Sequence, residues 1–258
     1  DHHLRRATTL VGAAIVLLVV LGLALLSTAT WLAGRGFTSV PATTGLGSPS
    51  SLPLTSGTGT VRVLPSGAVD EVTLALVAPG STTLPATDAQ VPAQVTRSSR
   101  AEGTTVEVRQ PARSFGSPWS NGTQDVLLLV PTDLELALEV HAHVDDVLVD
   151  GEFTALEVNA DIGNIDLELG SPAPAAVDLT AAIGDVDVLL PTDAGGRVSI
   201  ATDLGDIQVA APGTARWEVQ ADSELGEVST EPSLTDGTGE TVGTLTATTD
   251  LGNIDITR

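Results

Sequence analysis

A five-residue motif recurs through the second half of the chain and limits the fold more than any other feature. It consists of a large aliphatic residue, a glycine, an acidic or amide residue, a second aliphatic residue and usually a polar residue. The motif glycines are Gly163, Gly184, Gly205, Gly226 and Gly252, and the first four follow one another at intervals of 21 residues. A degenerate copy without the glycine begins at Val144. A regular interval of this length is typical of proteins built from stacked repeats.

Each repeat contains two short segments in which apolar and polar residues alternate, with the motif glycine between them. Alternation at period two indicates strands with one buried face, and the glycine allows a sharp corner because it reaches positive φ without strain. In one repeat we expect these residues to point inward: Val177, Leu179, Ala181 and Ile183. Two short strands cannot bury one face alone, so the units must stack. The sequence therefore predicts an all-β, parallel β-solenoid (β-helix-like) of roughly 21-residue repeats over residues 144–258.

Residues 60–143 also contain alternating segments, but without the 21-residue interval. We interpret them as the irregular, capping start of one β-solenoid domain that covers residues 60–258. The interval from Gly226 to Gly252 is longer, which predicts an extended return loop over residues 231–240. Because the chain stops within the last repeat, at Ile254–Arg258, we expect an open C-terminal solenoid edge there. Such an edge allows pairing with a second copy, and hence a homo-oligomer.

The N-terminal part contains a long uncharged segment that predicts a membrane anchor. Residues 7–34 lack charge, and the run from Leu10 to Leu26 is almost wholly apolar, whereas about 20 such residues span a bilayer as a helix. Basic residues are concentrated before the segment, at Arg5 and Arg6, which predicts a cytoplasmic N-terminus (1–7) and an extracytoplasmic remainder. We expect a transmembrane signal-anchor helix at 8–34 and a Gly/Ser/Thr/Pro linker at 35–59. A cleaved signal peptide, with cleavage near Ser27–Ala29, is the alternative.

The order of these segments resembles a known family. The strand at Thr60–Val63, the segment Thr104–Arg109, the run DVLLLVPTDLELALEV and the tandem glycine units follow one another. This order is similar to that of the bacterial DUF4097, or toast-rack, family of adhesin-like proteins, over about residues 58–258. The resemblance implies a solenoid-like β domain, often tethered to a membrane outside the cytoplasm, with roles in adhesion or envelope-stress signalling. It carries over no catalytic residues.

The charge of the chain excludes one class of partner and suggests one class of ligand. There are 33 acidic residues against 11 basic ones, all arginine, for a net charge of −22, so phosphate repulsion excludes nucleic acid. Asp185, Asp206 and Glu227 follow corner glycines and Asp187 begins a second strand. Stacked oxygen ligands at these four positions are candidates for Ca²⁺. Asn164 and Asn253 at equivalent positions favour an ordinary ladder of turn residues instead, so we expect no cofactor and keep Ca²⁺ as the alternative.

Other patterns of reactive residues are sparse. His141 and His143 share one face of a predicted strand, which is half of a zinc site, but no third ligand stands at a recognisable spacing. The chain has no Cys, no Lys and no G-x-S-x-G motif, which argues against nucleophilic catalysis. A polysaccharide-active β-helix enzyme is a weaker alternative, because its carboxylates need aromatic and basic partners that residues 144–258 hardly offer.

These observations favour a membrane-tethered, extracytoplasmic binding or scaffold protein of the bacterial cell envelope rather than an enzyme. We expect it to be a single-pass protein of the cell membrane whose partner is a protein or a cell-wall polymer. An accessory role in envelope-stress sensing is the alternative function.

Overall fold

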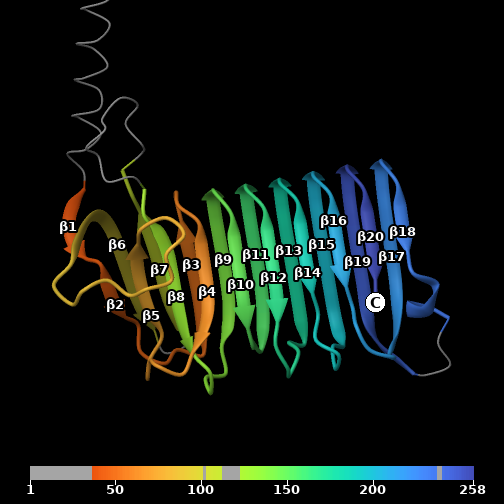
Figure 1. The fold of residues 1–258 in the computed structure, drawn as a ribbon, viewed down its shortest axis with the longest axis horizontal. Coiled ribbons are helices and arrows are strands. Elements are labelled where there is room, and N and C mark those ends of the chain that lie inside the picture. The colour runs from red at the N-terminus through yellow and green to blue at the C-terminus, as the bar shows by residue number, and fades with distance from the viewer. Residues whose placement is uncertain (1–36, 101–102, 112–122, 237–239) are drawn as a thin grey trace, which may run out of the picture.

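The computed structural model describes residues 37–100, 103–111, 123–236 and 240–258. Within these ranges the chain forms two ten-stranded sheets that lie face to face along one elongated body (Figure 1). The first sheet has the order β1 (Thr38–Pro41), β6 (Gln90–Arg100), β7 (Gly103–Arg109), β3 (Ser51–Ser56), β9 (Ala137–Val144), β11 (Ala155–Ile162), β13 (Ala176–Ile183), β15 (Gly196–Leu204), β19 (Thr241–Leu251) and β17 (Arg216–Leu225).

The second sheet faces the first. It has the order β18 (Val228–Thr230), β20 (Ile254–Thr257), β16 (Ile207–Ala210), β14 (Val186–Leu189), β12 (Ile165–Leu169), β10 (Val147–Gly151), β4 (Val61–Ser66), β8 (Asp125–Pro131), β5 (Thr73–Val77) and β2 (Thr43–Gly45). One 3-10 turn, η1 (Pro232–Leu234), follows β18. A strand of the first sheet and the strand of the second sheet that follows it across a corner are here called a rung.

The rungs stack in parallel, as the alternation of the sequence predicts. Leu156 of β11 pairs with Val177 of β13, which pairs with Val198 of β15. All three are buried, and the matching strands of the second sheet bury their own alternate aliphatics against them. Thin layers of Val, Leu, Ile and Ala fill the space between the sheets, which explains how the domain forms a core with hardly any aromatic residues. The prediction of an all-β, solenoid-like stack is confirmed.

The N-terminal end of the stack differs from the prediction. The segment predicted as a linker, 35–59, contains β1, β2 and β3, so that prediction was wrong for residues 38–56. Leu52 and Leu54 of β3 are fully buried, and their alternation was obscured by the surrounding Ser, Thr and Pro. Pro53 is tolerated because the pairing of β3 with β7 begins only at Leu54, so only β9 pairs alongside it. The β3/β4 rung lies between β7/β8 and β9/β10, and antiparallel strands close this end.

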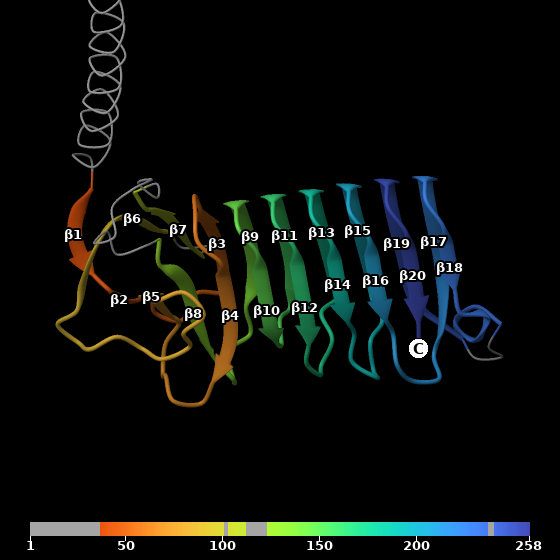
Figure 2. The same cartoon turned by 45° about the horizontal axis from the view of Figure 1, so that its top comes forward.

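At the C-terminal end the last two rungs are exchanged relative to the chain order. β19/β20 lies between β15/β16 and β17/β18, as both views show (Figures 1 and 2). The predicted open edge at Ile254–Arg258 was therefore wrong, because β17/β18 forms the outer edge. In this order β19, which is paired on both sides, buries Leu245 and Ala247 fully, whereas β17, which is paired on one side only, is half-exposed apart from Trp217.

Arg258 fixes the two connections that this exchange requires. Its guanidinium donates to the carbonyl oxygens of Gly213, Ala215 and Ser233, and its Nε donates to Ser233 Oγ at 2.7 Å. Its backbone N–H donates to Glu231 Oε2 at 2.9 Å. The final residue thus joins the loop that enters β17 to the loop that leaves β18.

No helix within the described ranges is long and apolar enough to cross a bilayer. The predicted anchor at 8–34 and the predicted cytoplasmic residues 1–7 lie outside the described residues.

Candidate binding surfaces

The motif glycines form a tightly packed line of corners, which lies along the upper edge in Figure 1. Gly184 has φ +152°, and a Cβ built on it would lie 2.0 Å from the carbonyl oxygen of Gly163 in the next rung. Any side chain here would collide with backbone, so glycine is required. The degenerate first copy has Asp145 at this place, with φ 92°, and its Oδ2 accepts a hydrogen bond from the Gly59 N–H at 2.9 Å.

The residues after the corners form a continuous hydrogen-bonded ladder. Asn164 Oδ1 accepts from the Asp185 N–H at 2.9 Å, and Asp185 Oδ1 accepts from the Asp206 N–H at 2.8 Å. Asp206 Oδ1 accepts from the Asn253 N–H at 2.6 Å, and Asn253 Oδ1 accepts from the Glu227 N–H at 3.0 Å. Both Asp and Asn supply the required oxygen, which explains why the two residue types alternate at these positions. Here the ladder of turn residues has a structural role.

The four calcium candidates occupy three different environments. Asp185 and Asp206 belong to the ladder, and Glu227 lies in the outermost rung. Asp187 lies on the outer face of the second sheet beside Asp166, where partial burial, with repulsion from Asp166 and Asp185, raises its pKa. Within the described residues these carboxylates form no group of three with converging ligand atoms. Calcium binding at the four positions remains the alternative to the expected absence of a cofactor.

The residues before the corners form a row of exposed aliphatic side chains, which we call the corner row. Its six members pair from strand to strand in the order Val144, Ile162, Ile183, Leu204, Leu251 and Leu225. Their exposed fractions run from 43% at the first to 70% at the last. Singly exposed aliphatics are ordinary on protein surfaces, whereas a contiguous row marks a candidate interaction site.

The corner row contradicts one expectation from the sequence, because Ile183 was predicted to point inward and is exposed. The alternation breaks at the end of each strand, where the pairing of β11 with β13 skips one position before it resumes at Ile162. The inner end of each rung is instead filled by a short residue, which is Ala142, Ala160 or Ala181 in three rungs and Thr202 or Thr249 in the next two. Thr202 Oγ1 donates to the carbonyl oxygen of Gly184 at 3.1 Å, and Thr249 Oγ1 to that of Gly205 at 3.1 Å.

Carboxylates flank the corner row. Asp161, Asp203 and Asp250 each precede a member of the row and are exposed. On its other side the post-glycine ladder contributes Asp185 and Asp206. The surface is thus a narrow apolar line between two acidic margins, and sequence reasoning missed it because it assumed strict alternation.

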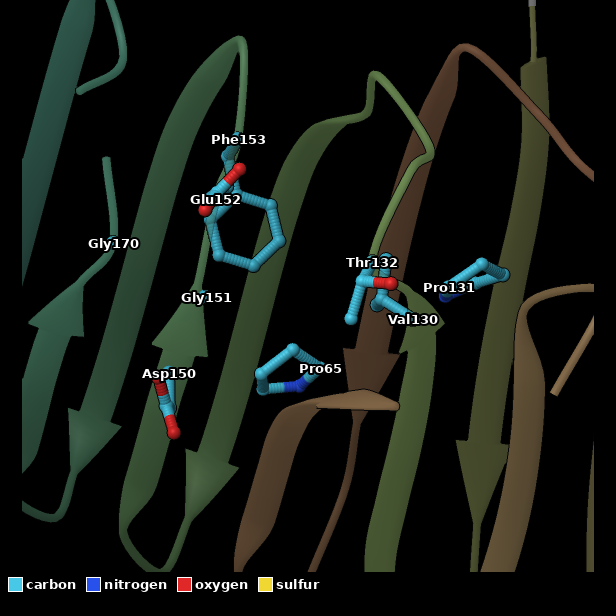
Figure 3. Close-up of a pocket in the computed structure, with 9 residues that line it drawn as sticks. All are labelled: Pro65, Val130, Pro131, Thr132, Asp150, Gly151, Glu152, Phe153 and Gly170. Carbon is cyan, nitrogen blue, oxygen red and sulfur yellow. The ribbon is translucent and has the colours of Figure 1, made fainter. Parts of the chain in front are cut away.

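A pocket of about 250 Å³ lies at the opposite edge of the solenoid, where the second-sheet strands end (Figure 3). Phe153 projects into it towards Pro65 and Thr132, with Asp150 and Glu152 at its rim. A neighbouring hollow shares Thr132, Glu152 and Phe153 with it. The lining has no basic group, so the pocket suits a small apolar group better than an anion. No sequence motif marked it, since its residues come from four separate segments at the ends of β4, β8, β10 and β12.

No protein-family model and no curated protein matches the chain. One similar solved structure is a "putative cell adhesion protein" from Clostridium sporogenes, which is 12% identical, with a TM-score of 0.50. The match covers 86% of this chain and 99% of that one. The two chains share a fold. A "putative adhesin" from Bacteroides fragilis is 13% identical with a TM-score of 0.43, over 85% of this chain and 97% of that one. Identities this low establish the fold alone, and membership of DUF4097 remains a prediction.

Proposed function

We propose that this chain is a membrane-tethered, extracytoplasmic binding or scaffold protein that acts without catalysis, in the manner of an adhesin. The observation that carries the proposal is the corner row, a line of six exposed aliphatics held at strand spacing on a rigid stack. The tether would be the predicted helix at 8–34. The name of the similar clostridial structure, a "putative cell adhesion protein", supports the same kind of role.

The chemistry of the corner row favours a protein partner over a wall polymer. Covering the exposed half of one Ile or Leu side chain contributes roughly 1 kcal/mol, and a sugar or phosphate chain offers little apolar surface in return. The acidic margins and the net charge of −22 favour a partner that carries basic residues beside an apolar strip. We therefore expect a surface protein with that pattern.

The test replaces two neighbours in the row while preserving strand propensity, as Ile183→Thr together with Leu204→Thr. Loss of two half-buried aliphatic contacts is expected to cost about 2 kcal/mol of binding, or roughly a 30-fold weaker interaction. Leu189→Thr is the matched control, because Leu189 is also exposed but lies on the outer face of the second sheet. The readout is capture of surface proteins by the full-length chain in intact membranes, with cell attachment measured in parallel.

Two results would contradict the proposal. Equal capture by the double variant and by wild type would show that the corner row is not the binding surface. Selective retention on purified wall polymer, unaffected by the double variant, would replace the protein partner with a polymer. Protease treatment of intact cells tests the topology, because only an extracytoplasmic domain is digested.

A further inference from the structure

Two histidines and a carboxylate converge on the outer face of the first sheet, near the start of the regular stack. His141 and His143 both lie on β9, and Asp161 lies on the neighbouring β11. The register of these strands pairs Asn159 with His141 and Ile162 with Val144, which sets Asp161 beside His143. The sequence showed only the two histidines, and the structure supplies the third group.

The distances bring all three side chains within reach of one ion. His143 Nδ1 lies 2.7 Å from Asp161 Oδ2, and His141 Nε2 lies 3.7 Å from Asp161 Oδ1. The two imidazole rings are 4.9 Å apart between centroids. One ligand atom from each residue falls within 4.8 Å of the others. In a tetrahedral zinc site with bonds of about 2.0–2.1 Å, ligand atoms lie about 3.3 Å apart, so small side-chain rotations complete the arrangement.

We infer that His141, His143 and Asp161 bind a divalent transition-metal ion, with Zn²⁺ as the best fit. Two imidazoles and one carboxylate form a donor set that Zn²⁺ accepts, whereas Ca²⁺ and Mg²⁺ prefer oxygen ligands throughout. Three protein ligands leave the fourth tetrahedral position to water, and the half-exposed side chains leave that position open to solvent.

The backbone that carries the ligands is held in place before any metal arrives. β9 pairs with β11 on one side and, from Ala137 to Ala142, with β3 on the other, so His141 lies where the strand is paired on both sides and His143 follows directly after. His141 and His143 stand two residues apart on one strand and therefore share a face. A metal ion here would join β9 to β11 and is expected to raise the melting temperature of the domain, since it binds only the folded arrangement. This inference is independent of the proposed partner of the corner row.

The experiment is a titration of the metal-free, full-length chain with Zn²⁺, followed by calorimetry, with Co²⁺ as a spectroscopic probe of tetrahedral geometry. We expect one equivalent of Zn²⁺ to bind, with Mg²⁺ silent. His141→Ala, His143→Ala and Asp161→Asn should each weaken binding at least about 100-fold, because each removes a direct ligand. The chain has four histidines, and the other two are His2 and His3. The double variant His2→Ala, His3→Ala is therefore the matched control and should bind as wild type.

Circular dichroism of the metal-free variants verifies that they fold, as substitutions on an exposed face are expected to allow. The inference is overturned if the His141→Ala and His143→Ala variants, once shown to be folded, bind Zn²⁺ as tightly as wild type. It is also overturned if the control variant loses the site. A titration in which Mg²⁺ competes equally with Zn²⁺ would likewise exclude a transition-metal site.

Discussion

Replacing a corner glycine should damage the stack far more than replacing other glycines. In Gly184→Ala the backbone would keep φ at +152°, in a region essentially confined to glycine, at a cost of about 1–3 kcal/mol. The new Cβ would also lie 2.0 Å from the Gly163 carbonyl oxygen, so the rungs must separate. Separation weakens the bonds from Gly163 N–H to Ile183 O and from Gly184 N–H to Leu204 O, both 2.9 Å and worth about 1 kcal/mol each.

These contributions add up to about 3–5 kcal/mol, a large part of the 5–15 kcal/mol that stabilises a typical domain. Two control glycines separate backbone conformation from contact. Gly47 has φ +77° but nothing within 4 Å of a built Cβ, so Gly47→Ala should cost about 1–2 kcal/mol. At Gly67 nothing lies within 4 Å of a built Cβ, and φ is outside the positive range that L side chains rarely adopt. Gly67→Ala should therefore change stability by less than about 0.5 kcal/mol.

The assay is equilibrium urea unfolding followed by far-ultraviolet circular dichroism, with the free energy extrapolated to water for all three variants. The reasoning would be refuted if Gly184→Ala and Gly47→Ala cost the same, because the contact between rungs would then contribute nothing. A small loss for Gly184→Ala accompanied by a lower m-value would instead indicate that the rungs beyond β13 detach separately.

Three further predictions concern charged residues. Burial, and then repulsion from Asp166 and Asp185, raises the pKa of Asp187, so its ionised form opposes folding. Asp187→Asn should therefore stabilise the protein at pH 7 by a few tenths to about 1 kcal/mol. This gain in stability should shrink as the pH falls through the raised pKa of Asp187 in the folded state, and it should vanish below the ordinary pKa of an aspartate. Urea unfolding at pH 7 and at about pH 3 measures the gain. An equal gain at the two pH values would refute the prediction. In the ladder, Asp185→Asn should be nearly neutral while Asp185→Ala costs about 1 kcal/mol, since only Asn keeps an oxygen to accept the Asp206 N–H; equal melting temperatures would contradict this. Arg258→Ala should increase amide hydrogen exchange in β17 and β18 with little effect on β9–β14, because the guanidinium joins the loop that enters β17 to the loop that leaves β18. An equal increase in exchange across the whole stack would argue against this role of Arg258.

The sequence was sufficient to predict features that depend on local pattern. Alternation predicted the strands around Gly163, Gly184 and Gly205, and the glycine interval predicted that these corners stack. Alternation failed at Ile183, because the pairing of β13 with β11 skips one position just before this residue and the strand end turns outward. Such a break belongs to the pairing between chain segments and leaves no periodic signal in either one.

Features that depend on which rung lies beside which were harder to predict. The exchange of β17 and β19 leaves no signal in either strand, since both alternate apolar and polar residues, and the interval from Gly226 to Gly252 suggested only a longer loop. Asp161 was missed as a partner of His143, although a signal for it existed. The degenerate first copy precedes the next by 18 residues, and the same offset applied to His143 leads to Asp161.

The exchanged rungs have a consequence for how the chain is made. β17 pairs only with β19, and β18 only with β20, so the outer rung has no native neighbour until the segment that ends at Thr257 has been synthesised. Until then, its 21-residue interval lets it dock directly on β15/β16, in the order of translation. The segment that forms β19 and β20 is synthesised after both neighbouring rungs and has to take its place between them. We therefore expect a slow folding phase in which β19/β20 takes its place between its two neighbours, and this phase should be absent when residues 240–258 are deleted.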